Sequence, residues 1–186
     1  MSMNNKDALL ESALYYASLG WPVLPLHTPR NAACSCGKGC RSVGKHPRYH
    51  DRLIPNGLRN ASADRWLIHQ WWGLWSDANI GICTGSPSGL VVIDVDPRHD
   101  GDKTIMNLQR EYGALPDLFR VRTGSGWHIY LKHPGGFIKS RPIAPGIDVK
   151  ADGGYVVAPP SKHATGNFYE WELEKMHIDE ILIKEK

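Results

Sequence analysis

Short apolar segments, separated by glycine and proline, make up most of the chain after residue 85. The 186 residues include 19 glycines and 13 prolines, a content that favours many turns between short elements over a helical bundle. A helix is expected in this part over residues 102–112, with Gly113 at its end. Strands are expected at 89–96, 119–123, 127–132, 146–150, 155–158 and 168–171. A sheet of short strands is therefore the main element of the expected fold.

The first part of the chain is expected to contribute helices. Apolar residues recur at helical spacing over 7–19, and Gly20 is a suitable stop. A short strand follows at 21–26, and Ser62 is a candidate N-cap for a helix that runs to about residue 75. Helices that come early and strands that come late predict an α+β domain, in which a mostly antiparallel mixed sheet is flanked by helices. A further short helix is expected over the last ten residues.

Length and charge suit one folded domain over residues 1–186. Lys and Arg number 22 and Asp and Glu 19, which gives a net charge of +3 with the nine histidines neutral. This balance permits a nucleic-acid partner without requiring one. No segment approaches the roughly 20 apolar residues that span a bilayer, and the polar N-terminus lacks the core of a secretory signal. We therefore expect a cytoplasmic protein with no membrane partner.

Residues 27–60 show no hydrophobic period, so a segment of this length needs an organiser of its own. Three cysteines within seven residues are typical of a metal site in a reducing compartment, and three thiolates with one imidazole suit structural Zn²⁺. The predicted ligands are Cys34, Cys36, Cys40 and His46. His50 is the alternative fourth ligand, and the sequence leaves that choice open. Cys83, in a strand-like segment, is expected to be an ordinary buried cysteine.

Two aspartates lie two residues apart at the end of an apolar strand. Because side chains alternate along a strand, Asp94 and Asp96 are expected on one face. Like charges this close raise each other's proton affinity and favour a divalent cation such as Mg²⁺. Asp148, from another strand, would complete a two-metal cradle for nucleotidyl transfer. The simpler alternative is that Asp96 and Pro97 open a turn.

Other polar side chains also share strand sides. Alternation places His128 with Lys132, and it places Asp148 with Lys150. The turn over 122–128 is rich in glycine, and its amides are candidates for holding a triphosphate. Glycine-rich turns are common, so this turn alone is weak support.

These motifs, in this order, resemble the N-terminal primase/polymerase domain of the archaeo-eukaryotic primase superfamily, which occurs in plasmid, phage and mobile-element replication proteins. The resemblance spans residues 8–172. The segments that carry it are 20–26, 44–48, 79–85, 90–97, 123–128 and 145–161.

The resemblance implies a palm like an RNA-recognition motif at residues 78–172, with the zinc loop of residues 27–60 inserted before it. It also implies that three carboxylates bind two Mg²⁺ or Mn²⁺ ions for catalysis: Asp94, Asp96 and Asp148. His128 is implied as a ligand of the nucleotide phosphates. Ser125 matches less well, because the family motif places serine where this chain has Gly126. Further cationic ligands of the triphosphate are expected at Arg122, Lys132 and Lys150.

The implied activity is template-dependent nucleotidyl transfer, which synthesises primers and extends DNA during plasmid, phage or mobile-element replication. Its implied partners are single-stranded DNA template and primer, dNTPs or NTPs, and a helicase domain if the chain is part of a longer replication protein. Two alternatives remain open. A two-metal nuclease uses the same carboxylates without needing a triphosphate pocket, and a non-catalytic module would only bind single-stranded nucleic acid.

Overall fold

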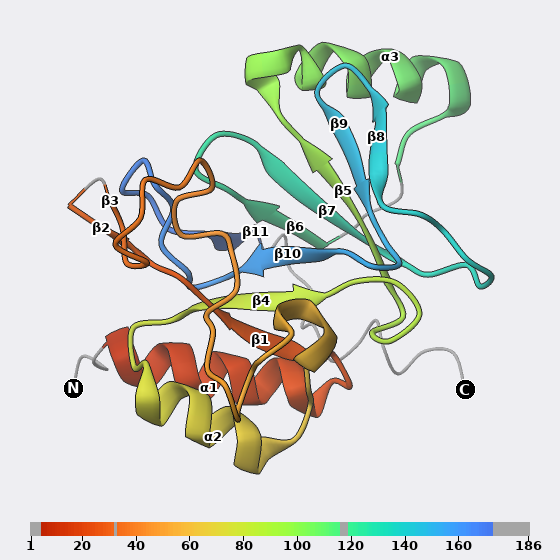
Figure 1. Cartoon of the computed structure of the whole chain (residues 1–186). Coiled ribbons are helices and arrows are strands. Elements are labelled where there is room, and N and C mark those ends of the chain that lie inside the picture. Colours follow the sequence, from red (N-terminus) through yellow and green to blue (C-terminus); the bar gives the residue numbers. More distant parts are fainter. Residues whose placement is uncertain (1–4, 32, 116–118, 173–186) are drawn as a thin grey trace.

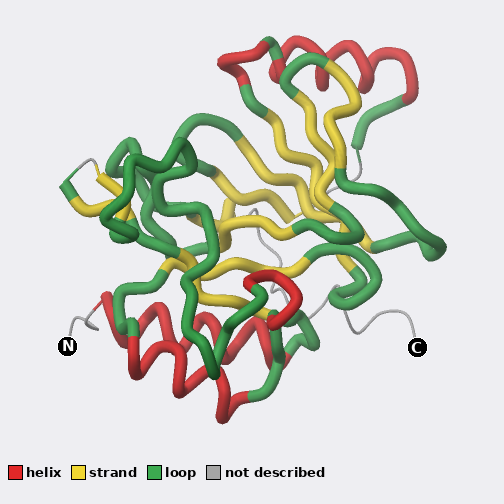
Figure 2. Tube along the Cα trace, in the orientation of Figure 1, coloured by secondary structure: helices red, strands yellow, loops and turns green. Residues whose placement is uncertain are grey.

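The structure is a computed structural model that describes residues 5–31, 33–115 and 119–172. In this part of the chain, three α-helices accompany two main antiparallel sheets and a two-stranded ribbon (Figures 1 and 2). The expected α+β class is confirmed. None of the helices within the described ranges is long and apolar enough to cross a membrane. The helix expected over the last ten residues lies outside the described residues.

The larger sheet has six strands in the order β11-β6-β7-β5-β9-β8, and all neighbouring pairs are antiparallel. The strand β5 is central, with β7 on one side and β9 on the other. The bounds are β5 (Leu90–Val95), β6 (Phe119–Arg122), β7 (Trp127–Lys132), β8 (Arg141–Ala144), β9 (Ile147–Lys150) and β11 (Glu170–Glu172).

The smaller sheet has three antiparallel strands in the order β1-β4-β10, and α1 and α2 lie on one side of it (Figure 1). Its strands are β1 (Val23–Leu26), β4 (Asn79–Cys83) and β10 (Tyr155–Ala158), and the helices are α1 (Asn5–Ser18) and α2 (Arg65–Leu74). Every residue of β4 is buried, and Trp71 and Trp72 of α2 are buried in the same core. Apolar burial on both faces of β4 holds the helices, the small sheet and part of the large sheet in one unit.

The N-cap of α2 differs from the prediction. Asp64 caps this helix, because its carboxylate accepts hydrogen bonds from the backbone N–H groups of Trp66 and Leu67. The hydroxyl of Ser62 instead accepts a hydrogen bond from the backbone N–H of Asp64. Ser62 therefore supports the residue that caps the helix, and the prediction that Ser62 is the cap was wrong.

The large sheet has different surroundings on its two faces. Val95, Ile129 and Ile147 form a small apolar cluster on the face near α3 (Gly101–Tyr112). Val92 and Tyr130 point to the other face and join the main core. The polar row described below shares this second face, so the site forms where the two sheets approach each other.

The strand order β6-β7-β5-β9, with α3 between β5 and β6, is compatible with a split β-α-β arrangement. Within residues 133–146, however, the structure has β8 where such a fold would place a second helix. An RNA-recognition-motif-like palm therefore stays a prediction. Residues 27–60 are mostly irregular, as expected, apart from the ribbon of β2 (Pro29–Arg30) with β3 (Ala33–Cys34) and the 3-10 helix η1 (Gly57–Asn60).

Candidate active site and metal centre

One row of residues across the large sheet contains three of the predicted site residues. Asp94 of β5 lies directly opposite His128 of β7 on one side and Asp148 of β9 on the other. Directly opposite residues in antiparallel strands point to the same face, with Cβ atoms about 4.5–5.5 Å apart. The imidazole Nε2 of His128 is 3.7 Å from Oδ1 of Asp94. The structure therefore brings these side chains together from three strands that are far apart in sequence.

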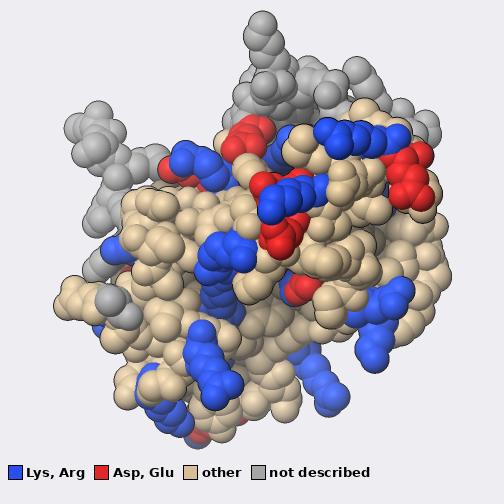
Figure 3. Space-filling view, turned by 90° about the horizontal axis from the view of Figure 1, so that it is seen from above, with Lys and Arg blue, Asp and Glu red and all other residues tan. Residues whose placement is uncertain are grey.

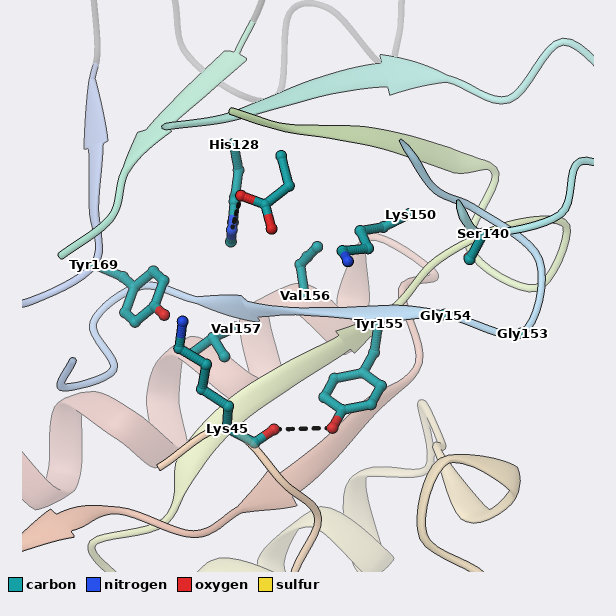
Figure 4. Close-up of a pocket in the computed structure, with 11 residues that line it drawn as sticks. Lys45, His128, Ser140, Lys150, Gly153, Gly154, Tyr155, Val156, Val157 and Tyr169 are labelled. Atoms are coloured by element: carbon teal, nitrogen blue, oxygen red, sulfur yellow. Dashed lines mark hydrogen bonds and ion pairs between the residues drawn. The ribbon is translucent and has the colours of Figure 1, made fainter. Parts of the chain in front are cut away.

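Asp94 and His128 of this row line a pocket of about 440 Å³ (Figure 4). Asp148 shares their face of the sheet, opposite Asp94, but is not among the residues that line the pocket. The large sheet supplies one wall, and β10 with the turn before it supplies the other. A third contribution comes from Lys45, in the segment 27–60. The lining residues are Lys45, Asp94, His128, Ser140, Lys150, Gly153, Gly154, Tyr155, Val156, Val157 and Tyr169.

His128 is held neutral by its surroundings. The side chain is buried, and burial together with the positive charges of Lys45 and Lys150 lowers the pKa of its imidazole to about 3. Its Nδ1 is buried without a hydrogen-bond partner in the described structure. A neutral imidazole in this position has one N–H to donate, which suits an anionic ligand in the pocket.

The pKa of Asp94 is shifted in the opposite direction from that of His128. Burial raises the pKa of its carboxyl group, and the negative charges of Asp148 and Asp96 raise it further, against the attraction of Lys150 and Lys45. A divalent cation beside Asp94 would relieve both the desolvation and the repulsion.

Asp96 begins a turn, as the simpler alternative expected, and its carboxylate is already occupied. It caps the 3-10 helix η2 (Pro97–His99). It accepts hydrogen bonds from Nε and Nη2 of Arg98 at 2.9 and 2.8 Å, and its Oδ2 lies 3.0 Å from Nδ1 of His99. The hydrogen bonds from Arg98 hold the pKa of Asp96 well below its usual range.

The donor set partly fits a divalent metal. Asp94 and Asp148 share a face, and both offer the hard oxygen ligands that Mg²⁺ prefers. In the described part of the chain, however, the three predicted carboxylates are not gathered within 4.8 Å of one another. Lys150 binds Oδ2 of Asp148 at 2.7 Å, and Arg98 binds Asp96. A shared metal therefore requires these two cations to release their carboxylates.

The remaining predicted nucleotide ligands lie in different places. Lys150 lines the pocket. Arg122 is opposite Trp127, on the other face of the sheet from His128, and it forms an ion pair with Glu170. The structure does not bring Arg122 to the pocket, because the register with β7 puts Val121 in the row of His128.

Lys132 and Ser125 are also outside the pocket lining. Lys132 shares the face of His128 but is opposite Leu90, at the other end of β5. Ser125 lies in the β6–β7 turn, where its backbone N–H donates to Oγ1 of Thr123.

Close packing explains why this turn has glycine at positions 124 and 126. A Cβ atom on Gly124 would overlap the imidazole of His163, and one on Gly126 would overlap the carbonyl oxygen of Val95. The departure from the family motif at Gly126 therefore reflects close packing of the turn against the end of β5.

The cysteine cluster is confirmed as a group that could hold a metal. Its ligand atoms all lie within 4.8 Å of one another, and the group consists of Cys34, Cys36, Cys40 and His46. Burial raises the pKa of the Cys34 thiol, but hydrogen bonds from the backbone of Gly44 and Cys36 and from the neighbouring thiols lower it to about 6. A readily formed thiolate favours metal binding.

His46, rather than His50, is the fourth member of the cluster. Nε2 of His46 is 3.3 Å from Sγ of Cys34. Nδ1 of His50 accepts hydrogen bonds from the backbone N–H groups of Arg52 and Leu53 instead. Cys83 is buried in β4, as expected.

Sequence reasoning missed several pocket residues, among them Lys45, Tyr155 and Tyr169. The two tyrosines lie in apolar strand-like stretches that carry no sign of a ligand. Lys45 was one of several basic residues in an irregular segment. The one hint in the sequence is that Lys45 directly precedes the predicted metal ligand His46, in a turn of the irregular segment.

Comparison with known proteins identifies the family. The family model described as bifunctional DNA primase/polymerase, N-terminal, matches residues 13–181, which is most of the chain. A comparison with curated proteins finds no match. The match agrees with the resemblance carried by the sequence motifs and covers the polar row, the pocket and the cysteine cluster. The chain belongs to the family of bifunctional DNA primase/polymerase N-terminal domains.

Proposed function

We propose that this domain synthesises primers and extends DNA on a single-stranded template by adding dNTPs or NTPs to a 3′ end. Family membership implies a primase/polymerase nucleotidyltransferase in replication. The observation that carries the finer proposal is the pocket that His128 and Asp94 line together with Lys45 and Lys150, with Asp148 directly opposite Asp94 on the same face of the sheet. A nuclease needs no pocket for a triphosphate, so the pocket cations favour synthesis over cleavage.

Asp94, Asp148 and Asp96 would hold two Mg²⁺ or Mn²⁺ ions. When bound, such ions lower the pKa of the attacking 3′-hydroxyl and neutralise charge on the triphosphate. The role of the protein is to hold the carboxylates where the ions can bind. Asp94 is already desolvated on the sheet face, and Asp96 becomes available when Arg98 turns away.

The pocket side chains would bind the triphosphate. His128 supplies a neutral N–H donor from a buried position. Lys150, once it releases Asp148, supplies a positive charge for phosphate oxygens. A helper role for Arg122 has no geometric support, because its side chain lies on the opposite face of the sheet.

Zn²⁺ is the proposed metal of the cysteine cluster. Three thiols and one imidazole form the ligand set of a closed structural zinc site. Bound there, the metal would order the irregular segment 27–60 rather than take part in the chemistry.

Template binding would rely on the phosphate backbone. In the view from above, basic side chains lie beside acidic ones, and further basic side chains extend across the same face (Figure 3). Contacts of this kind predict binding that weakens with added salt and depends little on template sequence. The proposed setting is a cytoplasmic replication protein of a plasmid, phage or mobile element, in which this domain works beside a helicase.

A synthesis assay on single-stranded DNA tests the proposal. Template is incubated with Mg²⁺ or Mn²⁺, with and without a primer, and with and without nucleotides. We expect products longer than the primer only when nucleotides are present, and new short products in the unprimed reaction. Shortening of the DNA without nucleotides would identify a nuclease, and binding with no change in length would identify a non-catalytic module.

A further inference from the structure

Two neighbouring residues of the chain belong to two different sites. His46 is a member of the metal cluster, 3.3 Å from the sulfur of Cys34. Lys45 lines the proposed nucleotide pocket, and in Figure 4 its side chain extends from the loop that carries it toward Tyr169 and His128. The backbone of these two residues therefore separates the metal cluster from the pocket.

Hydrogen bonds hold this backbone on both sides. The carbonyl of Lys45 accepts from the Tyr155 hydroxyl at 2.9 Å, and the carbonyl of His46 accepts from the backbone N–H of His27 at 2.9 Å. The carbonyl of Gly44 accepts from Nδ2 of Asn79 at 2.9 Å. These hydrogen bonds limit the freedom of the backbone over residues 44–46, which joins the two sites.

Close packing also limits the segment at Gly44. This residue has a φ of +72°, and a Cβ atom there would lie 2.5 Å from Cδ of Pro29. Pro29 belongs to the ribbon that also contains Cys34. The cysteine ligands and the residues next to Lys45 are therefore packed together within residues 27–60, called the metal loop below.

The Lys45 ammonium is a pocket cation without a bound counter-ion. Among the described carboxylates, none forms an ion pair with it, whereas Lys150 pairs with Asp148 and Arg98 pairs with Asp96. The side chain of Lys45 is accessible to solvent and lines the pocket beside Asp94 and His128. A phosphate group would supply the missing negative charge.

We propose that the metal loop is part of the nucleotide-binding site: metal at the cysteine cluster fixes His46 and so places the ammonium of Lys45 on the phosphates of the incoming nucleotide. This inference rests on the proposed function, and it assigns to the metal cluster a role in substrate binding beyond support of the fold. Lys45 acts as a phosphate ligand, and His46 acts as the residue that positions it.

Substitution of Lys45 tests the first half. Binding of dATP is measured by calorimetry with Ca²⁺ as the divalent ion, so that no turnover occurs. Lys45→Met is expected to weaken binding by about tenfold or more, because a charge-assisted hydrogen bond is lost. Lys45→Arg should restore most of the affinity. Lys38→Met, which removes the same charge from an exposed position in the same loop, should leave the dissociation constant unchanged.

Removal of the metal tests the second half. Cys36→Ser is compared with Cys83→Ser, which removes a thiol outside the cluster, and the zinc content and circular dichroism spectrum of each variant are measured. Cys36→Ser is expected to lose the metal and to weaken dATP binding as much as Lys45→Met does. Because both changes act through one contact, the double variant should bind no more weakly than either single variant.

Each contrary outcome has a distinct meaning. If the unmodified protein binds dATP but Lys45→Met binds equally well, the inference is wrong and the proposed function stands. If Lys45→Met weakens binding while the metal-free Cys36→Ser does not, the coupling to the metal is wrong. If the unmodified protein does not bind dATP, the proposed function fails and the inference fails with it.

Discussion

At the scale of single residues, Gly126 is the position where packing and motif conflict. A serine there would match the family motif more closely, but its Cβ would overlap the carbonyl oxygen of Val95. We expect Gly126→Ser to lower the free energy of unfolding by about 1–3 kcal/mol through overpacking. Gly73→Ala is the control, because Gly73 is exposed in α2 with no atom within 4 Å of the added methyl. Urea unfolding should show a small gain for this control, and equal stability of the two variants would contradict the packing argument.

His163 gives a pH dependence at the same scale. Burial lowers its pKa from 6.5 to about 4, with help from the charges of Lys45 and Arg98. Between these two values the unfolded chain binds a proton that the folded protein does not, so the contribution to stability is complete above pH 6.5 and is lost as the pH falls toward 4. His163→Gln should therefore show a shallower decline of Tm from pH 6.5 to 4 than the unmodified protein. The difference in Tm between the two proteins above pH 7 provides the baseline. Curves of Tm against pH that stay parallel from pH 7 to 4 would contradict the prediction.

At the scale of elements, Ser62 and Asp64 have different roles at the start of α2. Asp64 accepts two hydrogen bonds from the first turn of the helix, whereas the hydroxyl of Ser62 accepts one from the backbone N–H of Asp64. Asp64→Ala should cost about 1 kcal/mol of unfolding free energy, and Ser62→Ala should cost less. Thermal or urea unfolding of the two variants checks the order, and a larger loss for Ser62→Ala would restore it as the cap.

Most elements could be predicted from their own residues, and the failures have local causes. The strand β8 was missed because it is a four-residue edge strand with Pro142 in it and three exposed residues, so no apolar alternation marks it. The face of Arg122 could not be predicted either. Alternation groups the residues of one strand, but it does not say on which face of the sheet each group lies. Only the pairing of Val121 with His128 decides that.

At the scale of the whole molecule, the pocket is assembled from three distant parts of the chain. Lys45 comes from the metal loop, Asp94 from the large sheet, and Tyr155 from the small sheet. Alternation within each strand grouped His128 with Lys132 and Asp148 with Lys150, but only the strand order places His128 and Asp148 on either side of Asp94. The sequence did not predict that β10 pairs with β4 rather than with the large sheet, and this pairing forms the opposite wall. The contribution of Lys45 depends on that packing and is invisible in local patterns.

The central claim is that Asp94 anchors the chemistry of nucleotide addition, and the rate of template-directed incorporation by Asp94→Asn tests it most directly. The substitution keeps the size of the side chain and removes its charge, while Asp7→Asn makes the same change at an exposed position in α1. With circular dichroism showing both variants folded, we expect Asp94→Asn to lose at least about a thousandfold in rate, because it lacks a metal ligand. Asp7→Asn should match the unmodified protein. Incorporation by Asp94→Asn at a rate close to that of Asp7→Asn would contradict the assignment of the polar row as the active site.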